Sequence, residues 1–424
     1  MTDSLDNGKY ATSAHYTGSG HIRCGPGGRS FTVDATFGLR SEVRLVNRVF
    51  DPATPDLAEV YRPAGRCVAI VDATVDHLHG NALREYFTAH GIPLVTMVCR
   101  ALEADKTLDT VCRMTAFLGS DGCDVARGEP VLVVGGGVLT DTAGLACALL
   151  NRRTPYVMVG TSIVSAVDAG PSPRTCVNGT LMKNALGAYH PPVLTLVDRA
   201  LFSTLAPEHL RHGAAEIVKM AAVDDEALFT LLQRHGRALL DTRFATTGDD
   251  PDLAAVADEV LFRSLHAYMR HEGTNMFETR QDRPHAYGHT WSAKFEPVAG
   301  LLHGHAVAVE MALTATLATL VGWLDEDGRD ALVAVCRDLG LAVHHPVIED
   351  LALMKVAQDT MRRKRGGSAL WAVVPRGGLG KCDYLDDVED ALLAEAVDRH
   401  RAHCDRFPDG GSGLGMYLRD ARWT

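Results

Sequence analysis

The run VLVVGGGVLTDTAGLACALL at residues 131–150 constrains the fold of this chain more than any other feature. Four apolar residues, three glycines and an Asp-containing turn precede a long Ala- and Leu-rich segment, an order typical of strand, tight turn and helix. Glycines let backbone N–H groups approach a pyrophosphate, and the helix start supplies a partial positive charge. Such a turn also joins many strands and helices that bind no nucleotide, so its surroundings decide whether Gly136 and Gly137 form a phosphate site.

Short apolar segments alternate with amphipathic ones ahead of this run. Strands are predicted at 66–71, 92–99 and 131–137, with helices over 77–91 and 108–122 between them. Strands that alternate with helices predict a parallel, Rossmann-like sheet. After about residue 199, four long segments have the apolar spacing of helices. These segments are 207–223, 225–240, 252–271 and 305–324. The fold class is therefore predicted as α/β, with a Rossmann-like domain followed by a mainly α-helical domain.

Composition divides the chain into four parts. We expect a flexible segment rich in Gly, Ser and Thr at 1–30, a Rossmann-like domain at 31–199, an α-helical domain at 200–405 and an irregular, Gly-rich tail at 406–424. Apolar and polar side chains alternate from Ser30 to Phe50, which predicts the strands of an N-terminal hairpin.

The charge and apolar content argue against two classes of partner. With 42 Lys and Arg against 53 Asp and Glu, the 424-residue chain has a net charge of -11, which speaks against a nucleic-acid surface. No uncharged apolar run reaches the roughly 18 residues of a membrane span, and the polar N-terminus lacks the apolar segment of a secretory signal. The ten cysteines form no CxxC pair and resemble buried apolar residues. These features predict a cytoplasmic protein.

Polar residues follow the predicted strands at the edge that carries the glycine turn. Asp72 ends one strand, where a carboxylate accepts hydrogen bonds from ribose hydroxyl groups. The further candidates at this edge are Glu103, Lys106, Asp141, Thr161 and Ser162. This context favours a dinucleotide site over a glycine turn of purely structural origin.

One carboxylate and two imidazoles in the second half of the chain suit a divalent metal. Glu216 lies in HGAAEIVK, His289 in GHTWS and His303 in LLHGH. Three ligands of this His₂Glu type leave a fourth position open for substrate or water, as a catalytic zinc ion requires. His212 and Glu216, four residues apart on one predicted helix, form a rival ligand pair.

The order of these motifs resembles the sugar phosphate cyclase superfamily, which includes 3-dehydroquinate synthase. The resemblance covers roughly residues 65–385 and rests on GGGVLTDTAG, VDAG…VNGTLMKN, GAYHPPVLTLVD, HGAAEIVKM, GHTWS and LLHGHAV. GHTWS and GAYHPPVLTLVDRALFSTL most resemble the 2-epi-5-epi-valiolone synthases within it. Ala286 and Ala293 stand where 3-dehydroquinate synthases carry Asn and His. The resemblance implies the two-domain dehydroquinate synthase-like fold.

The resemblance also assigns roles by motif position. It implies the metal ligands Glu216, His289 and His303. It implies NAD contacts from Asp72, Glu103, Lys106, Gly136, Gly137, Asp141, Thr161, Ser162, Lys183 and Thr204. It implies catalytic, substrate-pocket roles for Asp168, Arg174, Asn184 and Lys219. Arg152 matches an arginine that reaches the neighbouring subunit's active site, which implies a homodimer.

The implied activity is that of a phosphate-eliminating lyase with NAD⁺ and Zn²⁺, or Co²⁺, as cofactors. The substrate class is a phosphorylated ketose, sedoheptulose 7-phosphate, and the product is 2-epi-5-epi-valiolone or a stereoisomer, a precursor of C7-cyclitol natural products. Transient oxidation by NAD⁺ acidifies a C–H bond, phosphate leaves by β-elimination, the hydride returns, and an intramolecular aldol reaction closes the ring. NAD⁺ is therefore recycled, not consumed.

Three positions depart from the family pattern. Arg174 replaces a lysine, His305 replaces the glutamate of an LHGE motif, and Ala286 replaces an aspartate of the valiolone-type cyclases. His305 is expected either to take over a hydrogen bond beside the metal or to add a ligand.

Three alternative functions are left open. They are a dehydroquinate synthase-like cyclase acting on another sugar phosphate, a metal-dependent polyol or glycerol-phosphate dehydrogenase, and a catalytically impaired homologue.

Two further features have simpler interpretations. The basic cluster Arg362–Arg365 forms either a solvated face or a late phosphate-binding element. His190, between two turn-forming elements, is expected to be structural.

Overall fold

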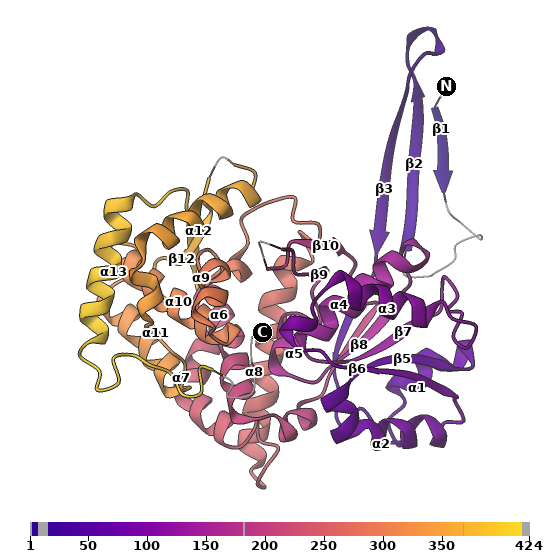
Figure 1. The fold of residues 1–424 in the computed structure, drawn as a ribbon, viewed down its shortest axis with the longest axis horizontal. Helices are drawn as coiled ribbons and strands as arrows, with labels where there is room; N and C mark the ends of the chain where they lie inside the picture. Colours follow the sequence, from indigo (N-terminus) through magenta and orange to yellow (C-terminus); the bar gives the residue numbers. More distant parts are fainter. Residues whose placement is uncertain (1, 7–15, 181–182, 368, 418–424) are drawn as a thin grey trace.

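The computed structural model describes residues 2–6, 16–180, 183–367 and 369–417. Figure 1 shows a parallel sheet flanked by helices, a second part built mainly from helices, and a slender antiparallel sheet that projects from the first part. No helix in the described ranges is long and apolar enough to cross a bilayer. The predicted α/β fold class is confirmed, whereas the domain boundaries stay a prediction.

The main sheet consists of six parallel strands that are largely buried. Its order is β4 (Glu42–Leu45), β11 (Leu194–Val197), β8 (Tyr156–Gly160), β7 (Val131–Gly135), β5 (Cys67–Asp72) and β6 (Leu94–Cys99). The helices are α1 (Asp56–Tyr61) and α2 (Ala73–Ala89) on one face, with α3 (Leu108–Leu118) and α4 (Gly137–Leu149) on the other. Each strand predicted from 66 to 137 is present, because buried parallel strands read as continuous apolar runs.

The helical part packs around α10 (His303–Leu320), which is buried from Gly304 to Ala318. Around it lie α5 (Ile163–Val167), α6 (Pro207–Asp224), α7 (Glu226–Asp241), α8 (Pro251–Glu272), α9 (Ser292–Ala299), α11 (Glu326–Asp338), α12 (Leu351–Lys364) and α13 (Asp390–Cys404). All four predicted long helices are confirmed. Their apolar stripes form a common core with the end of the sheet.

Shorter elements connect these layers. Two antiparallel hairpins that the sequence did not predict are β9 (Arg174–Val177) with β10 (Leu186–Tyr189), and β12 (Ala372–Pro375) with β13 (Cys382–Leu385). Short segments of 3-10 helix are η2 (Pro26–Gly28), η3 (Arg62–Ala64), η4 (Glu103–Asp105), η5 (Leu150–Arg152), η6 (Arg199–Thr204), η7 (Pro284–Ala286) and η8 (Pro346–Glu349).

The N-terminal region differs from the sequence prediction. Residues 2–6 and 16–24 form β1 (Thr2–Asp6) and β2 (Tyr16–Cys24), and β2 pairs with both β1 and β3 (Phe31–Leu39). The flexibility expected of residues 1–30 stays a prediction. The hairpin predicted within 30–50 is wrong. Strand β3 pairs with β2, which precedes it in the chain, and β4 joins the main sheet instead. The glycines that suggested flexibility lie within a regular ladder.

The predicted C-terminal tail is described only in part, and its boundary stays a prediction. Residues 406–417 form turns, and their backbone is tied to the helical part by hydrogen bonds from Leu302 N to Met416 O (2.9 Å) and from Val343 N to Gly411 O (2.9 Å). Residues 418–424 lie outside the described residues.

Candidate active site

Three side chains from separate segments converge as the sequence predicts. Glu216 lies in the middle of α6, His289 in the turn before α9, and His303 at the first residue of α10. One ligand atom of each lies within 4.8 Å of the other two, and His303 Nε2 is 3.3 Å from Glu216 Oε1. The rival pair does not form, because His212 Nε2 lies 3.3 Å from His209 Nδ1 and His212 is outside this group.

The surroundings of the triad fit a divalent cation. His289 Nδ1 donates a hydrogen bond to Tyr287 O at 2.8 Å, and burial lowers the pKa of His289 to about 3, so its neutral Nε2 has a free lone pair. His303 Nδ1 is 2.9 Å from Glu296 Oε2, which directs His303 Nε2 toward Glu216. Such outer carboxylate partners are typical of metal-bound histidines. Among the residues that the structure describes, none gives either oxygen of buried Glu216 a hydrogen bond of good geometry, as expected of a ligand without its ion.

Lys219 and Asp168 adjoin this triad. Lys219 is fully buried one turn after Glu216 on α6, and its Nζ lies 2.6 Å from Glu216 Oε2 and 3.1 Å from Asp168 Oδ2. Burial alone would lower the pKa of Lys219, but the two carboxylates outweigh it and raise the pKa above its ordinary value. The site therefore holds a fixed positive charge that a developing oxyanion can use.

The carboxyl ends of the sheet strands carry the predicted dinucleotide residues. Gly136 is the N-cap of α4 without a side-chain cap, so the first N–H groups of that helix are available to a phosphate. Ser162 caps α5 beside it, and the backbone N–H of Thr161 donates to Gly135 O at 3.0 Å. One oxygen of Asp72 caps α2 by accepting from Thr74 N and Val75 N, which orients this carboxylate at the same edge.

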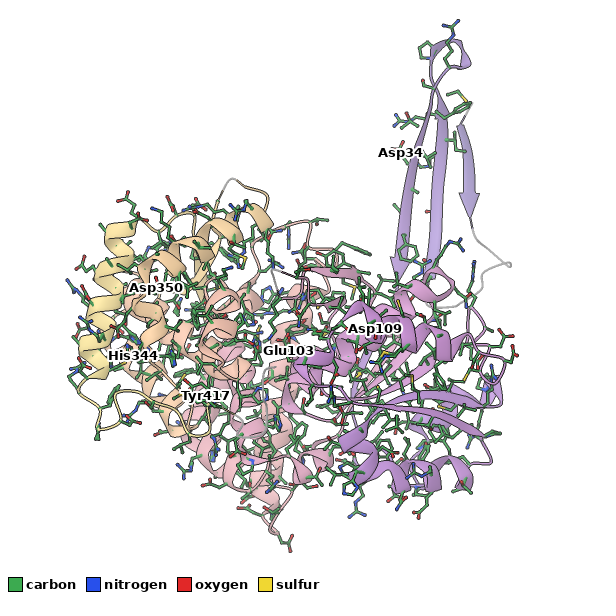
Figure 2. The ribbon with its side chains drawn as sticks, viewed as in Figure 1. Asp34, Glu103, Asp109, His344, Asp350 and Tyr417 are labelled. Carbon is green, nitrogen blue, oxygen red and sulfur yellow. The ribbon has the colours of Figure 1, made fainter. Side chains whose placement is uncertain are left out.

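A row of charged contacts joins this edge to the metal triad. Lys106 Nζ lies 2.6 Å from Asn184 Oδ1 and also contacts Asp141. Lys183 Nζ is 3.6 Å from Glu103 Oε1 and 2.5 Å from Glu296 Oε1. Since Glu296 is also bonded to His303, the residues matched to NAD and those matched to the metal share one buried network; Figure 2 shows Glu103 between the sheet and the helices.

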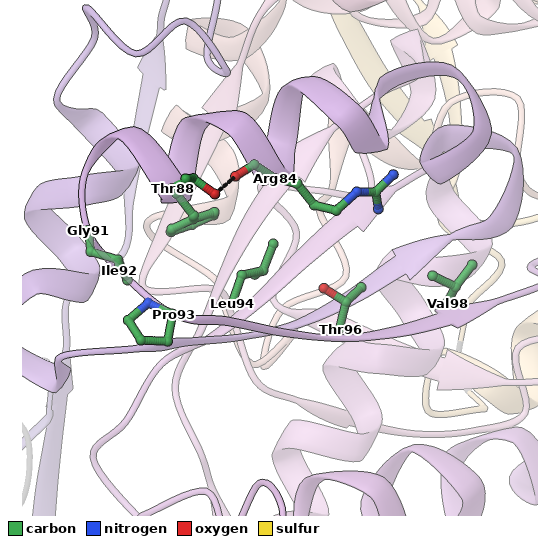
Figure 3. Close-up of a pocket in the computed structure, with 9 residues that line it drawn as sticks. Arg84, Thr88, Gly91, Ile92, Pro93, Leu94, Thr96 and Val98 are labelled. Carbon is green, nitrogen blue, oxygen red and sulfur yellow. Dashed lines mark hydrogen bonds between the residues drawn. The ribbon is translucent and has the colours of Figure 1, made fainter.

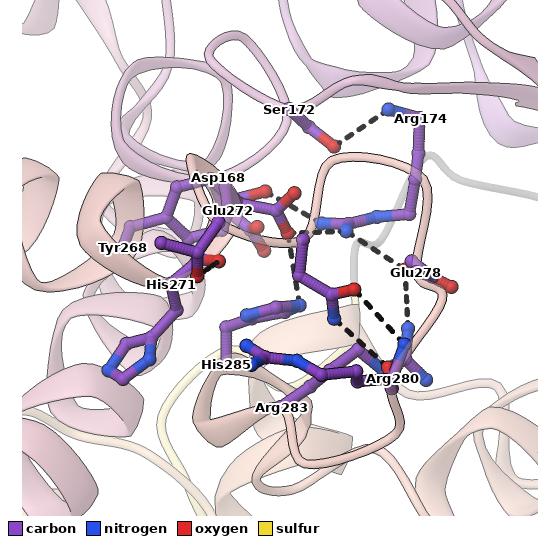
Figure 4. Close-up of polar contacts among 12 residues, drawn as sticks. Asp168, Ser172, Arg174, Tyr268, His271, Glu272, Glu278, Arg280, Arg283 and His285 are labelled. Carbon is purple, nitrogen blue, oxygen red and sulfur yellow. Dashed lines mark hydrogen bonds and ion pairs between the residues drawn. The ribbon is translucent and has the colours of Figure 1, made fainter. Parts of the chain in front are cut away.

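Arg174 is held by a cluster of its own (Figure 4). Its Nη1 lies 2.6 Å from Glu272 Oε1 and 3.0 Å from Glu278 Oε1, and its Nη2 donates to Tyr268 OH at 2.6 Å. Burial would lower the pKa of Arg174, but these partners raise it above its ordinary value. The guanidinium charge is thus balanced by two protein carboxylates, as the ammonium charge of Lys219 is, and the substrate-pocket role of Arg174 stays a prediction.

Two further predicted residues lie at different places relative to the dinucleotide edge. Thr204 ends η6, where its hydroxyl contacts His79 Nε2 at 2.9 Å, on the helix that Asp72 caps. Arg152 lies beyond the C-terminal end of α4, about 20 Å of helix from Gly136. Arg152 therefore does not join the site of its own chain, and its role in a neighbouring subunit stays a prediction.

The remaining departures from the family pattern have structural explanations. His305 is not a ligand: it is fully buried, and its Nδ1 accepts a hydrogen bond from Ala342 N at 3.0 Å, which ties α10 to the segment after α11. The expected hydrogen bond beside the metal comes instead from Glu296. His285 Nε2 lies 3.0 Å from Glu272 Oε1, so its imidazole belongs to the Arg174 cluster.

The members of the basic cluster differ in their surroundings, and a phosphate-binding role for any of them stays a prediction. Arg362 pairs with Asp387 and Arg363 is exposed, as expected of a solvated face. Arg365 is 5% exposed, and its Nη1 donates to Trp371 O at 2.9 Å and lies 3.4 Å from Thr290 Oγ1, next to His289. Burial lowers the pKa of Arg365 to about 10. Arg365 is therefore the member of the cluster nearest to the GHTWS motif.

A groove of about 530 Å³ lies elsewhere, between α2 and the edge strand β6 (Figure 3). Its lining includes Phe87, Ile92 and Leu94, and its one cation, Arg84, pairs with Asp76 at 2.8 Å. None of the predicted site residues lines this groove, so the groove is separate from the candidate metal site.

Four residues of the site network carry no motif that predicts them. These are Glu296, Tyr268, Glu272 and Glu278. For Glu296, the sequence offers one indication of a role at the site. Glu296 lies four residues after Ser292, on the helix that begins just after His289. Glu272 and Tyr268 share one face of α8, four residues apart, and resemble ordinary helix residues until the fold brings Arg174 to them.

Comparison with known proteins decides the family. The model of the 3-dehydroquinate synthase N-terminal domain matches residues 96–212, and that of its C-terminal domain matches residues 213–365. A 2-epi-5-epi-valiolone synthase of an Actinoplanes species is 41% identical over 378 residues, which cover 88% of this chain and 94% of the relative. The chain belongs to the sugar phosphate cyclase superfamily. A demethyl-4-deoxygadusol synthase of Trichormus variabilis is 35% identical over 390 residues, covering 92% of this cyclase and 94% of the relative.

Solved structures agree with this assignment. The 2-epi-5-epi-valiolone synthase ValA of Streptomyces hygroscopicus subsp. jinggangensis, a structure with NAD⁺ and Zn²⁺ bound, superposes on the cyclase with a TM-score of 0.81 and 35% identity. The match covers 88% of this chain and 99% of ValA. A 2-deoxy-scyllo-inosose synthase with NAD⁺ and Co²⁺ gives a TM-score of 0.68 at 21% identity, covering 90% and 99% of the two chains, and so supports the fold alone.

Proposed function

We propose that this chain is a lyase that cyclises sedoheptulose 7-phosphate to 2-epi-5-epi-valiolone, or a stereoisomer, with release of phosphate. NAD⁺ and Zn²⁺, or Co²⁺ in its place, are the proposed cofactors. The single observation that carries the proposal is the buried network in which Glu296 joins His303 of the metal triad to Lys183 of the dinucleotide set. Relatives named for this product and the NAD⁺- and Zn²⁺-bound structure of ValA support it.

The two cofactors together supply reversible hydride removal and polarisation of the substrate oxygen. Glu216, His289 and His303 would hold the cation, while Glu296 keeps the His303 imidazole in the orientation that presents Nε2. Lys219, locked between two carboxylates, places its ammonium group where negative charge develops on oxygen. The burial of Lys219 and Glu216 excludes water from this part of the site.

Arg174 has a positioning role in this proposal. Its partners Tyr268 and Glu272 fix the start of β9 against α8, so Arg174 shapes the pocket wall rather than contributing an unpaired charge to the substrate. Asn184 Oδ1 lies 2.6 Å from Lys106 Nζ. We propose that Arg152 completes the site of a neighbouring subunit in a homodimer, and that the enzyme works in the cytoplasm.

A second candidate product follows from the pocket. Ala286 offers no carboxylate, and a relative of 35% identity is named for demethyl-4-deoxygadusol. The same residues would then close the ring to that cyclitol. A dehydrogenase is disfavoured, because the polyol dehydrogenases found among solved structures, such as a glycerol dehydrogenase of Schizosaccharomyces pombe at 13% identity, share the fold alone. An impaired homologue is disfavoured because the triad, Lys219 and Asn184 are all in place.

Incubation with sedoheptulose 7-phosphate, NAD⁺ and Zn²⁺ or Co²⁺ tests the proposal. We expect inorganic phosphate together with a cyclitol, whose identity NMR and mass spectrometry establish. A product with the spectrum of demethyl-4-deoxygadusol would select the second candidate. Phosphate-free turnover with accumulating NADH would indicate a dehydrogenase, and NAD⁺ binding without any turnover would indicate an impaired homologue.

A further inference from the structure

Glu310 lies in the middle of α10, seven residues after His303, and is only 1% exposed. Its carboxylate accepts hydrogen bonds from three consecutive backbone N–H groups. Oε1 accepts from Thr290 N at 2.7 Å, and Oε2 accepts from Trp291 N at 2.7 Å and from Ser292 N at 2.5 Å. Because burying a carboxylate is costly unless its oxygens are bonded, this arrangement indicates a definite task for Glu310. The proposed chemistry uses none of these contacts.

The backbone that donates these bonds belongs to the turn that carries His289. Thr290, the first donor, directly follows His289 in the chain. On the other side of His289, the Tyr287 OH group donates a hydrogen bond of 2.9 Å to Met311 O, which also lies on α10. The turn is therefore bonded to α10 both before and after the histidine, by a phenol on one side and by the Glu310 carboxylate on the other.

The same N–H groups form the N-terminus of α9. Ser292 is the first residue of this helix, and the side chain of its N-cap residue Trp291 cannot accept a hydrogen bond, because an indole N–H only donates. The first N–H groups of a helix need acceptors and carry a partial positive charge. The Glu310 carboxylate supplies both the acceptors and the opposite charge. Since α9 also carries Glu296, which bonds to His303 at 2.9 Å, the placement of α9 affects the second imidazole as well.

We propose that Glu310 is a positioning residue for the metal site. It fixes the turn of His289 and the start of α9 against the helix that begins with His303. It thereby sets the spacing of the two imidazoles, whose ring centres lie 5.2 Å apart. Glu310 acts through the backbone, not on a ligand side chain. The inference rests on the proposed function in taking Glu216 and the two histidines as a metal site.

An ordinary helix cap would be simpler than the arrangement found at α9. The helices α7, α8 and α11 are capped by the aspartate that directly precedes each of them, and each aspartate accepts from one backbone N–H group. These aspartates are Asp225, Asp250 and Asp325. At α9 the acceptor comes from another helix and takes three N–H groups. This arrangement couples two segments that carry metal ligands, which a local aspartate would not do.

Replacing Glu310 by Gln separates this role from general packing. The amide keeps the shape of the side chain, but its NH₂ group would face backbone N–H groups that now have an acceptor. Thr316→Val is the matched control on the same helix. It removes a buried hydroxyl that lies 3.2 Å from His400 Nδ1, and it leaves the turn of His289 unchanged. Urea titrations of the metal-free, full-length proteins measure how far each variant is destabilised.

Zn²⁺ and Co²⁺ are the probes. Competition with a chromophoric chelator measures the Zn²⁺ dissociation constant, and the visible absorption of bound Co²⁺ reports the geometry of its ligands. We expect Glu310→Gln to raise the Zn²⁺ dissociation constant by about tenfold and to change the Co²⁺ spectrum. Thr316→Val should leave both unchanged even where it lowers stability. Glu310→Asp, which sets the carboxylate back by one methylene, should give an intermediate constant.

Two outcomes would overturn the inference. One is a wild-type Zn²⁺ constant and Co²⁺ spectrum in Glu310→Gln, or in Glu310→Asp if the glutamine variant does not fold. The other is equal weakening in Thr316→Val, which would make the effect one of general stability. The titration requires neither NAD⁺ nor substrate. Weakened binding in Glu310→Gln alone would therefore support the inference even if the wild type released no phosphate, and a wild-type constant in that variant would overturn it even if the wild type were an active cyclase.

Discussion

The carboxylate of Glu296 and the imidazole of His303 are joined by a hydrogen bond of 2.9 Å, and the other oxygen of Glu296 lies 2.5 Å from Lys183 Nζ. Burial would raise the pKa of Glu296, but Lys183 and His303 hold it below its ordinary value, so the carboxylate stays charged. One side chain thereby orients a metal ligand and anchors a residue of the dinucleotide set.

Replacing Glu296 by Gln should weaken metal binding. The amide keeps the shape of the side chain but removes the charge that supports His303, and loss of such a partner typically costs 10- to 100-fold in metal affinity. Competition with a chromophoric chelator measures the Zn²⁺ dissociation constant. The control Glu395→Gln removes only a surface ion pair with Arg399 and should leave the Zn²⁺ dissociation constant unchanged. Equal affinities of both variants would exclude this role for Glu296.

Removing a ligand should abolish turnover and metal content together. Glu216→Gln and His303→Ala each leave only two protein ligands, so we expect loss of bound zinc by elemental analysis and loss of phosphate release. His212→Asn is the matched control, because His212 faces His209 instead of the triad. A chelator should inactivate the wild type and added Zn²⁺ or Co²⁺ should restore it. Wild-type rates in either ligand variant would refute the metal assignment.

Arg174→Lys should lower stability while keeping the enzyme active. Lysine retains the charge but cannot contact Glu272, Glu278 and Tyr268 at once, since it lacks the planar fork of arginine. The loss of hydrogen bonds to charged groups should reduce the free energy of unfolding by about 2 kcal/mol in urea titrations. The surface change Arg237→Lys should cost less than about 0.5 kcal/mol. Unchanged stability of Arg174→Lys would mean that the cluster does not hold β9.

Stability should fall as the pH drops from about 6.5 to 4. Burial lowers the pKa of His190 to about 4, and its Nε2 donates a hydrogen bond to Thr154 O at 2.7 Å. The unfolded chain then binds more protons in this interval, so the stabilisation is complete above about pH 6.5 and is lost toward pH 4. Urea titrations should show a shallower pH dependence for His190→Gln than for wild type, by about 1–3 kcal/mol across this interval. An identical slope would contradict a neutral His190.

Mixing two inactive variants tests whether Arg152 acts across the dimer. If Arg152→Ala and Lys219→Ala subunits exchange freely, half of the dimers are mixed, and each mixed dimer has one intact site. Phosphate release should therefore recover to about a quarter of the wild-type rate. Mixing Arg152→Ala with itself is the control. No recovery despite confirmed subunit exchange would place Arg152 outside the neighbouring site.

The sequence predicts the parallel sheet and the long helices well, because their apolar patterns are local. The triad of Glu216, His289 and His303 was also predictable from motif position. Glu296 and the partners of Arg174 were not, because their roles arise only when α8 and α9 pack beside residues far away in the chain. The same holds for β2, whose glycines suggest flexibility until β3 provides the pairing strand.

One assay tests the central claim most directly. Phosphate release from sedoheptulose 7-phosphate and the absorbance of NADH at its nicotinamide band are recorded together, with NAD⁺ in small excess over enzyme. A cyclase built on this network should release many equivalents of phosphate per NAD⁺ while NADH stays at a low, constant level. Phosphate limited to one equivalent per NAD⁺, or NADH that rises with turnover, would contradict it.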